Sequence, residues 1–123
     1  MPRFFLVAGA LVMALGVALG AYAAHASRSA LHPDAARLLQ TAVQYQLIHG
    51  LGLIAVGLLA RSAPSRWLTA AGALLLVGIV LFCGSLWVLA LTTRSLGLIA
   101  PLGGIAMIGG WIALAVHAAL AKA

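Results

Sequence analysis

The sequence has very few charged residues, and almost none of them is acidic. Of its 123 residues, 7% are charged and 65% are hydrophobic. A soluble domain carries about 25% charged residues, so this chain has too few charges to cover a surface in water. The composition therefore predicts a membrane protein that forms one compact domain over residues 1–123.

The scarcity of acids argues against one class of small membrane protein. A proton-coupled exporter exchanges protons for a cation at a carboxylate that lies within the membrane. The single acid of this chain, Asp34, lies outside or at the edge of the apolar runs. The sequence therefore speaks against a small multidrug-type antiporter, although the length is similar.

The sequence also has a single cysteine, Cys83, which lies inside an apolar run. A lone cysteine forms no intrachain disulfide and no cysteine metal cluster. We interpret Cys83 as a small buried helix residue. No combination of thiolate, carboxylate and imidazole completes a zinc site, so we predict no metal site and no cofactor.

The basic residues do not form a patch, although the formal net charge is +6. They lie singly at the ends of the apolar runs, as Arg3, Arg28, Arg37, Arg61, Arg66, Arg94 and Lys122. Basic residues in such positions anchor membrane helices at the membrane surface. We therefore predict membrane lipid as a partner and no nucleic acid.

Four long apolar runs, separated by short charged breaks, make up most of the sequence. A helix of about 20 residues crosses the hydrocarbon core of a membrane, and each run is long enough. We expect membrane-spanning helices over 4–24, 34–60, 67–92 and 96–120. The predicted fold class is all-α, an integral membrane bundle of four transmembrane helices with short loops and both termini on the same side.

The first run also resembles a cleaved secretory signal, because Arg3 precedes it and small residues follow it at 21–26. The remaining chain would still consist mostly of membrane helices, so we expect this helix to be retained. Basic residues favour the cytoplasmic side of a membrane. They number four on the side of the termini and three on the other, which predicts cytoplasmic termini.

Glycine is abundant, and all 14 glycines lie in or at the edge of the four runs. Gly16, Gly20 and Ala24 are spaced four residues apart, and such rows of small residues let helices approach closely in lipid. They predict tight helix contacts and a closed homo-oligomer, with dimer and trimer both open. Pro101, with glycines at 103–104, predicts a kink or a loosened turn in the fourth helix.

Polar side chains gather on the second run. At 100° per residue, Thr41, Gln44, Tyr45 and His49 fall within one arc of a helix. Such groups are costly in lipid unless something bonds them, so we expect this face to look inward. The candidate polar centre also includes three residues outside this arc. They are Ser85 of the third helix, His25 near the connector, and Gln46, which could face a neighbouring chain instead.

His49 is the most suggestive of these residues. It could bind haem or a metal, or relay a proton, or it could be a neutral histidine bonded to Gln44, Ser85 or a backbone carbonyl. We favour the structural role, because a buried polar group usually has a partner. His25 lies about 16 Å away along the membrane normal, which disfavours a haem between the two. No acid orients His49 as a base for Ser85, so we predict no enzymatic activity.

Several strings of the sequence together resemble one known family. They are GAYAAHA at 20–26, TAVQYQ at 41–46 with His49, GI at 78–79 with LFCGSLW at 81–87, LT at 91–92, APLGG at 100–104 and GW at 110–111. In this order and spacing they resemble the bacterial YgdD-type family, which is related to a small eukaryotic transmembrane protein. The resemblance covers nearly the whole chain and implies a four-helix protein of the bacterial inner (cytoplasmic) membrane.

The resemblance implies no activity, because the function of the family is unknown. Its recurrent polar positions correspond to the seven residues of the candidate polar centre. Four residues depart from the usual pattern, and they are Ala23, Cys83, Trp87 and Ala100 in place of glycine, serine, tyrosine and threonine. The departures weigh against a hydrogen-bond role at positions 83 and 100.

Three functional hypotheses remain open on the sequence. The first is a non-enzymatic oligomeric helix bundle that organises lipid or partner proteins, because the loops have no room for a soluble catalytic domain. The alternative is a transporter or pore for a small neutral or weakly charged solute, lined by Gln44, Tyr45 and His49. A third is a redox or cofactor-binding membrane subunit, which rests on His25 and His49.

Overall fold

The computed structural model describes residues 2–26, 33–92 and 94–121, and these residues form four helices and no strand. The helices are α1 (Pro2–Ala26), α2 (Pro33–Ser62), α3 (Arg66–Thr92) and α4 (Ile99–Leu120). Each is long and apolar enough to cross a membrane. The prediction of an all-α bundle of four transmembrane helices is therefore confirmed.

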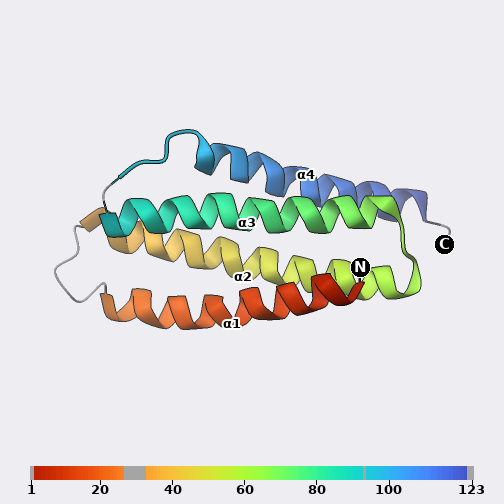
Figure 1. The fold of residues 1–123 in the computed structure, drawn as a ribbon, viewed down its shortest axis with the longest axis horizontal. Helices are drawn as coiled ribbons and strands as arrows, with labels where there is room; N and C mark the ends of the chain where they lie inside the picture. Colours follow the sequence, from red (N-terminus) through yellow and green to blue (C-terminus); the bar gives the residue numbers. More distant parts are fainter. Residues whose placement is uncertain (1, 27–32, 93, 122–123) are drawn as a thin grey trace.

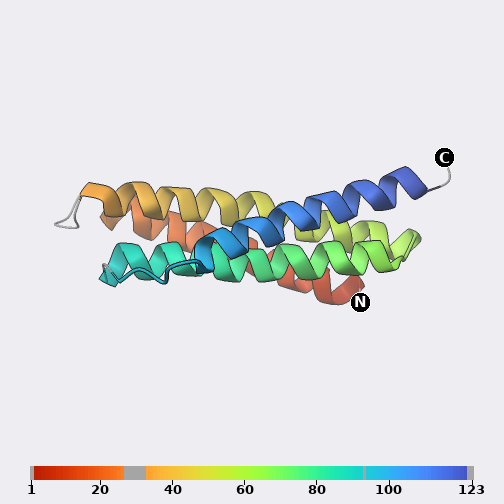
Figure 2. The same ribbon diagram turned by 90° about the horizontal axis from the view of Figure 1, so that it is seen from above.

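The helices alternate in direction, and α2 and α3 lie between α1 and α4 (Figure 1). Each helix packs on the next along the chain, and α4 crosses α3 at an angle when seen from above (Figure 2). The start of α1, the turn at 63–65 and the end of α4 lie at one end of the bundle (Figure 1), which we call the termini end. The connector end holds the end of α1, the start of α2, the end of α3 and residues 94–98.

Local chemistry sets the helix boundaries. Pro33 fits the first turn of α2, where a backbone N–H has no intrahelical partner. Asp34 follows at the positive end of the helix dipole and pairs with Arg37 at 3.4 Å. At the turn after α2, the Ser65 hydroxyl accepts a hydrogen bond from the Leu68 N–H at 3.2 Å, which caps the start of α3.

The fourth helix begins at Ile99 rather than at residue 96. Gly97 has a φ of 66°, a left-handed turn conformation that glycine adopts readily and that a helix cannot contain. Pro101 consequently lies in the first turn of α4, where its missing N–H breaks no helix hydrogen bond. The helix continues unbroken from there to Leu120, so the proline imposes no interruption.

The core consists of apolar side chains, most of them from the two middle helices. The largest fully buried side chains are Leu39, Leu53, Leu68, Leu75 and Val56. Lipid is as apolar as leucine, so burying these side chains against one another adds little hydrophobic free energy in a membrane. The bundle must therefore depend on close van der Waals packing between its helices.

Two helix pairs approach closely at glycines. A Cβ atom at Gly103 of α4 would lie 2.5 Å from the Phe82 nitrogen and 3.0 Å from the Gly78 oxygen of α3. A Cβ atom at Gly9 of α1 would lie 3.0 Å from the Ile54 nitrogen of α2. These neighbours are backbone atoms, which cannot turn aside as a side chain does, so both positions need glycine.

Candidate functional site

Four rings from three helices meet near the middle of the bundle. Tyr45 and His49, one turn apart on α2, stack with 5.7 Å between ring centroids and 10° between ring planes. The Phe82 ring of α3 lies 4.7 Å from that of Tyr45, and the Trp111 ring of α4 lies 5.7 Å from that of His49. Aromatic rings at 4.5–7 Å attract one another, so this aromatic cluster joins α2 to both α3 and α4.

His49 is buried, and its ring has a hydrogen-bond partner. The Nδ1 atom lies 2.7 Å from the Tyr45 carbonyl oxygen. A carbonyl oxygen only accepts, so Nδ1 carries the proton and Nε2 is left as an acceptor in the neutral ring. A backbone carbonyl is one of the partners expected for a structural His49.

Phe82 and Trp111 were not among the residues predicted from the sequence to contact the second helix. Gly52, one turn beyond His49, leaves room for the indole, because a Cβ atom there would lie 2.9 Å from the Trp111 ring. Tryptophan of a membrane helix usually lies at the membrane surface, whereas Trp111 lies in the middle of α4. That unusual depth is the signal in the sequence from which a packing role for Trp111 could have been predicted.

Gln46 is buried and contacts the neighbouring helix of its own chain. Its Nε2 atom donates a hydrogen bond of 3.0 Å to the Val12 carbonyl of α1, and the residue is only 4% exposed. The idea that Gln46 faces a neighbouring chain is therefore wrong. The physical reason is that α1 covers the side of α2 that lies away from the aromatic cluster.

Gln44 is exposed, so the expectation that the whole polar arc looks inward is also wrong. The neighbouring helices cover only part of the polar arc of α2. His49 contacts Trp111 of α4, Thr41 is half-buried, and Tyr45 is 39% exposed. Gln44 lines an outer groove of about 410 Å³ between α1 and α2. The outer α1/α2 groove is formed by Gly20, Ala23, Ala24, Gln40, Val43, Gln44 and Leu47.

Ser85 does not meet the polar side chains of α2. Its hydroxyl donates to the Phe82 carbonyl of its own helix at 3.0 Å, and no hydrogen bond among the described residues joins it to Gln44, Tyr45 or His49. A serine that bonds within its own helix needs no partner on another helix. The expected meeting of Ser85 with the second helix is thus wrong, and Phe82 takes its place beside Tyr45.

Cys83, rather than Ser85, donates a hydrogen bond from α3 to α2. Its Sγ atom lies 3.2 Å from the Ala42 carbonyl oxygen of α2 and donates to it. The expectation of no hydrogen-bond role at position 83 is therefore wrong, since a thiol is a weak donor that suits a buried site. A third histidine, His117 of α4, bonds Ser65 at 2.8 Å at the termini end.

His25 and His49 are not brought together. His25 is exposed in the last turn of α1 at the connector end, whereas His49 is buried near the middle of α2. Over residues 2–26, 33–92 and 94–121, no group of three or more His, Cys, Asp or Glu side chains is placed to hold a metal ion. The structure thus separates the two histidines on which a cofactor site would rest.

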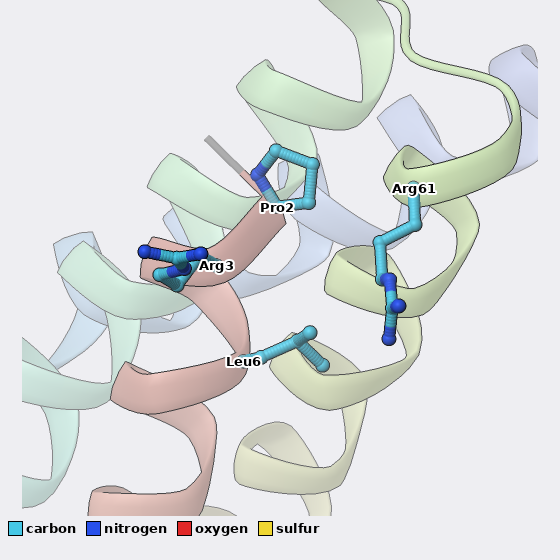
Figure 3. A pocket seen from close by; sticks show the side chains of 4 residues that line it. All are labelled: Pro2, Arg3, Leu6 and Arg61. Carbon is cyan, nitrogen blue, oxygen red and sulfur yellow. The ribbon is translucent and has the colours of Figure 1, made fainter.

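The termini end carries a basic pocket of about 430 Å³. Arg3 and Arg61 line it together with Pro2 and Leu6, and Leu6 lies between the two arginines in Figure 3. The one acidic side chain of the chain, Asp34, lies in the first turn of α2 at the connector end. The two guanidinium groups therefore have no carboxylate side chain at their own end of the bundle, and phosphate is a group that they bind well.

Comparison with known proteins shows the family. Residues 19–104 match the family described as "Protein of unknown function (DUF423)". The chain belongs to this family. The match runs from the second half of α1 to the first turns of α4, and it therefore includes the outer α1/α2 groove and most of the aromatic cluster.

The DUF423 relatives are described as membrane proteins. The UPF0382 membrane protein YwdK of Bacillus subtilis is 42% identical over 118 residues, which cover 94% of this chain and 96% of the relative. A UPF0382 membrane protein of Staphylococcus haemolyticus is 42% identical over 91% of this chain and 92% of its own. The UPF0382 inner membrane protein YgdD of Escherichia coli is 32% identical over 94% of this chain and 89% of its own. The resemblance to the YgdD-type family is thus confirmed, and no solved structure matches the chain.

Proposed function

We propose that this DUF423 protein is a non-enzymatic, homo-oligomeric helix bundle that organises lipid or partner proteins in the bacterial cytoplasmic membrane. The observation that carries the proposal is the outer α1/α2 groove, where the exposed amide of Gln44 lies beside small residues of α1. The aromatic cluster adds support, since the ring of His49 is packed and hydrogen-bonded as a structural residue.

The depth of Gln44 makes its exposure informative. At 1.5 Å per residue it lies about 5 Å from the midpoint of α2, which places it well inside the hydrocarbon core. An amide there is costly without a partner. A second copy of the chain supplies one, because an amide both donates and accepts and a two-fold axis brings the same side chain to both sides.

The small residues of the groove favour the same occupant. Gly20 and Ala24 of α1 border the groove beside Gln40 and Gln44 of α2. Small residues in a row let two helix backbones approach closely in lipid. Two copies that meet here would pack α1 against α1 and place their glutamines within reach of each other.

Self-association through this groove is expected to weaken when the groove is filled or made apolar. We expect Gln44→Leu and Ala24→Leu each to weaken the dimer by about tenfold, because a two-fold axis counts every change twice. Native mass spectrometry in mild detergent measures the fraction of dimer. The matched control is Ala115→Leu, at an exposed alanine of α4, which should leave the fraction unchanged. A wild-type protein that is monomeric across several mild detergents would contradict the proposal.

The proposed orientation places the termini end in the cytoplasm. The basic pocket of Arg3 and Arg61 supports it, because the cytoplasmic leaflet is rich in anionic lipid. We expect a cysteine at the exposed Ser62 to be labelled by a membrane-impermeant thiol reagent only after the cells are opened. A cysteine at the exposed Ser95, at the connector end, should be labelled on intact cells. The opposite pattern would reverse the orientation.

A further inference from the structure

The basic pocket at the termini end is built for an anion. Its volume is about 430 Å³, and its lining residues come from α1 and α2. Figure 3 shows Arg3 near the start of α1 and Arg61 near the end of α2, with Pro2 and Leu6 beside them. The basic pocket shares none of its lining residues with the outer α1/α2 groove, so the two are separate sites on the same helix pair.

Close packing of α1 on α2 brings the two arginines to the same depth. A Cβ atom at Gly57 of α2 would lie 2.7 Å from Cγ and 3.1 Å from the backbone nitrogen of Leu6. From this contact, Arg3 lies three residues toward the start of α1, which is about 4.5 Å of helix rise. Arg61 lies four residues toward the end of α2, which is about 6 Å. Because the helices are antiparallel (Figure 1), both steps lead toward the termini end.

Neither arginine has an anionic partner in the part of the chain that the structure describes. The ion pair found there joins Arg37 to Asp34 at the connector end. At 1.5 Å per residue, Asp34 lies about 40 Å from Arg61 along α2. Arg3 and Arg61 are both exposed, so their guanidinium groups can reach a group outside the chain. Two like charges that line one pocket repel each other unless an anion lies between them.

We infer that the basic pocket binds one phosphate group, held by the guanidinium groups of Arg3 and Arg61 together. A guanidinium group donates two parallel N–H bonds to the oxygens of a phosphate. The positive end of the α1 dipole adds to their charge, because α1 begins at Pro2, which lines the pocket. The headgroup of an anionic phospholipid and free phosphate present the same oxygens, so both are sources of the ligand.

The place of the basic pocket in the membrane favours the lipid headgroup. Helix α1 has 25 residues, which is about 37 Å of helix rise, and the hydrocarbon core is about 30 Å thick. The first turn of α1 therefore reaches the level of the headgroups. For this source, the inference rests on the proposed function and deepens it, because it names the lipid group that the bundle binds.

The first test is competition between phosphatidylglycerol and phosphatidylcholine with the same acyl chains. Both carry a phosphodiester, but choline adds a positive charge that the arginines repel. Native mass spectrometry of the purified protein, mixed with equal amounts of both, gives the ratio of the bound lipids. We expect the wild type to prefer phosphatidylglycerol by about twofold to fivefold, the range of exposed ion pairs. Arg3→Gln and Arg61→Gln should each lower this preference about twofold, because the phosphate loses one of its two ionic partners.

Arg66→Gln is the matched control. Arg66 is exposed at the same end of the bundle, at the start of α3, but it does not line the basic pocket. The three variants change the net charge equally, and all three place glutamine at an exposed position, so their melting temperatures should equal that of the wild type. We expect Arg66→Gln to keep the wild-type preference for phosphatidylglycerol.

The second test uses inorganic phosphate as the probe. Thermal unfolding in one detergent is followed while inorganic phosphate replaces chloride at constant ionic strength. A rise in melting temperature in the wild type and Arg66→Gln, but not in Arg3→Gln or Arg61→Gln, would identify free phosphate as the ligand. A preference for phosphatidylglycerol without this rise would identify the lipid headgroup.

Two results would overturn the inference. One is a wild type with neither a preference for phosphatidylglycerol nor a response to phosphate. The other is an Arg66→Gln variant that loses as much as the two pocket variants, because charge at this end would then act without the pocket. The spectra of the first test also report the dimer. Loss of the site with the dimer intact would remove this inference alone, whereas a monomer that keeps the lipid preference would remove only self-association.

Discussion

Replacing Gly103 by alanine is expected to destabilise the bundle, whereas the same change at Gly104 should not. A Cβ atom at Gly103 would lie 2.5 Å from the Phe82 nitrogen and 3.0 Å from the Gly78 oxygen, both backbone atoms of α3. Helices α3 and α4 must move apart to admit it, which forfeits the close packing that holds helices together in lipid. Overpacking of this kind costs about 1–3 kcal/mol, and occasionally more.

Gly104 is the internal control, because it follows directly in the chain and a Cβ atom there meets nothing within 4 Å. Alanine also favours a helix over glycine by about 1 kcal/mol, so Gly104→Ala should be as stable as wild type or slightly more so. Denaturant or thermal unfolding in one detergent measures both variants. Equal stability of the two variants would contradict the close approach of the α3 backbone to Gly103.

Replacing His49 by alanine is expected to lower the free energy of unfolding by about 2–3 kcal/mol. The change removes two ring contacts, with Tyr45 and Trp111, each worth about 0.5–1.5 kcal/mol. It also removes the hydrogen bond from Nδ1 to the Tyr45 carbonyl, and such bonds in membranes average about 0.6 kcal/mol. Thermal unfolding in detergent measures the loss.

Two further variants at position 49 separate these contributions. His49→Gln keeps a donor and an acceptor but no ring, whereas His49→Phe keeps a ring but no donor. Since the rings are worth more than the hydrogen bond, we expect phenylalanine to restore more stability than glutamine. A glutamine variant that folds like wild type but loses a bound group or an activity would instead assign His49 to a ligand or a proton pathway.

The polar face of the second helix could be predicted from the sequence only in part. The residues themselves predict a helix with polar groups on one arc, and they predict that His49 is buried. They do not say how many neighbours the helix has. Because α2 packs on both α1 and α3, Gln46 on one side is buried and Gln44 on the adjoining side is exposed.

The start of the fourth helix shows a local limit. An apolar run from residue 96 onward does not reveal that Gly97 adopts a positive φ. Once that turn is formed, Pro101 falls in the first turn, where it is tolerated. The break between α2 and α3 was easier to predict, because Pro64 lies between Arg61 and Arg66 in a short charged segment that separates two apolar runs.

Four membrane-spanning helices could be predicted from the amino-acid sequence without any knowledge of how they pack. That conclusion follows from composition and run length, which act on each helix separately. Which side chains of different helices meet is visible in the folded bundle alone, and the aromatic cluster and the outer α1/α2 groove are the clearest examples. The physical reason is that lipid exerts no hydrophobic force between helices. Which helices pair therefore depends on how well their surfaces fit together, for example where a glycine leaves room for a ring or for the backbone of another helix. The periodicity of apolar residues along one helix does not specify that fit.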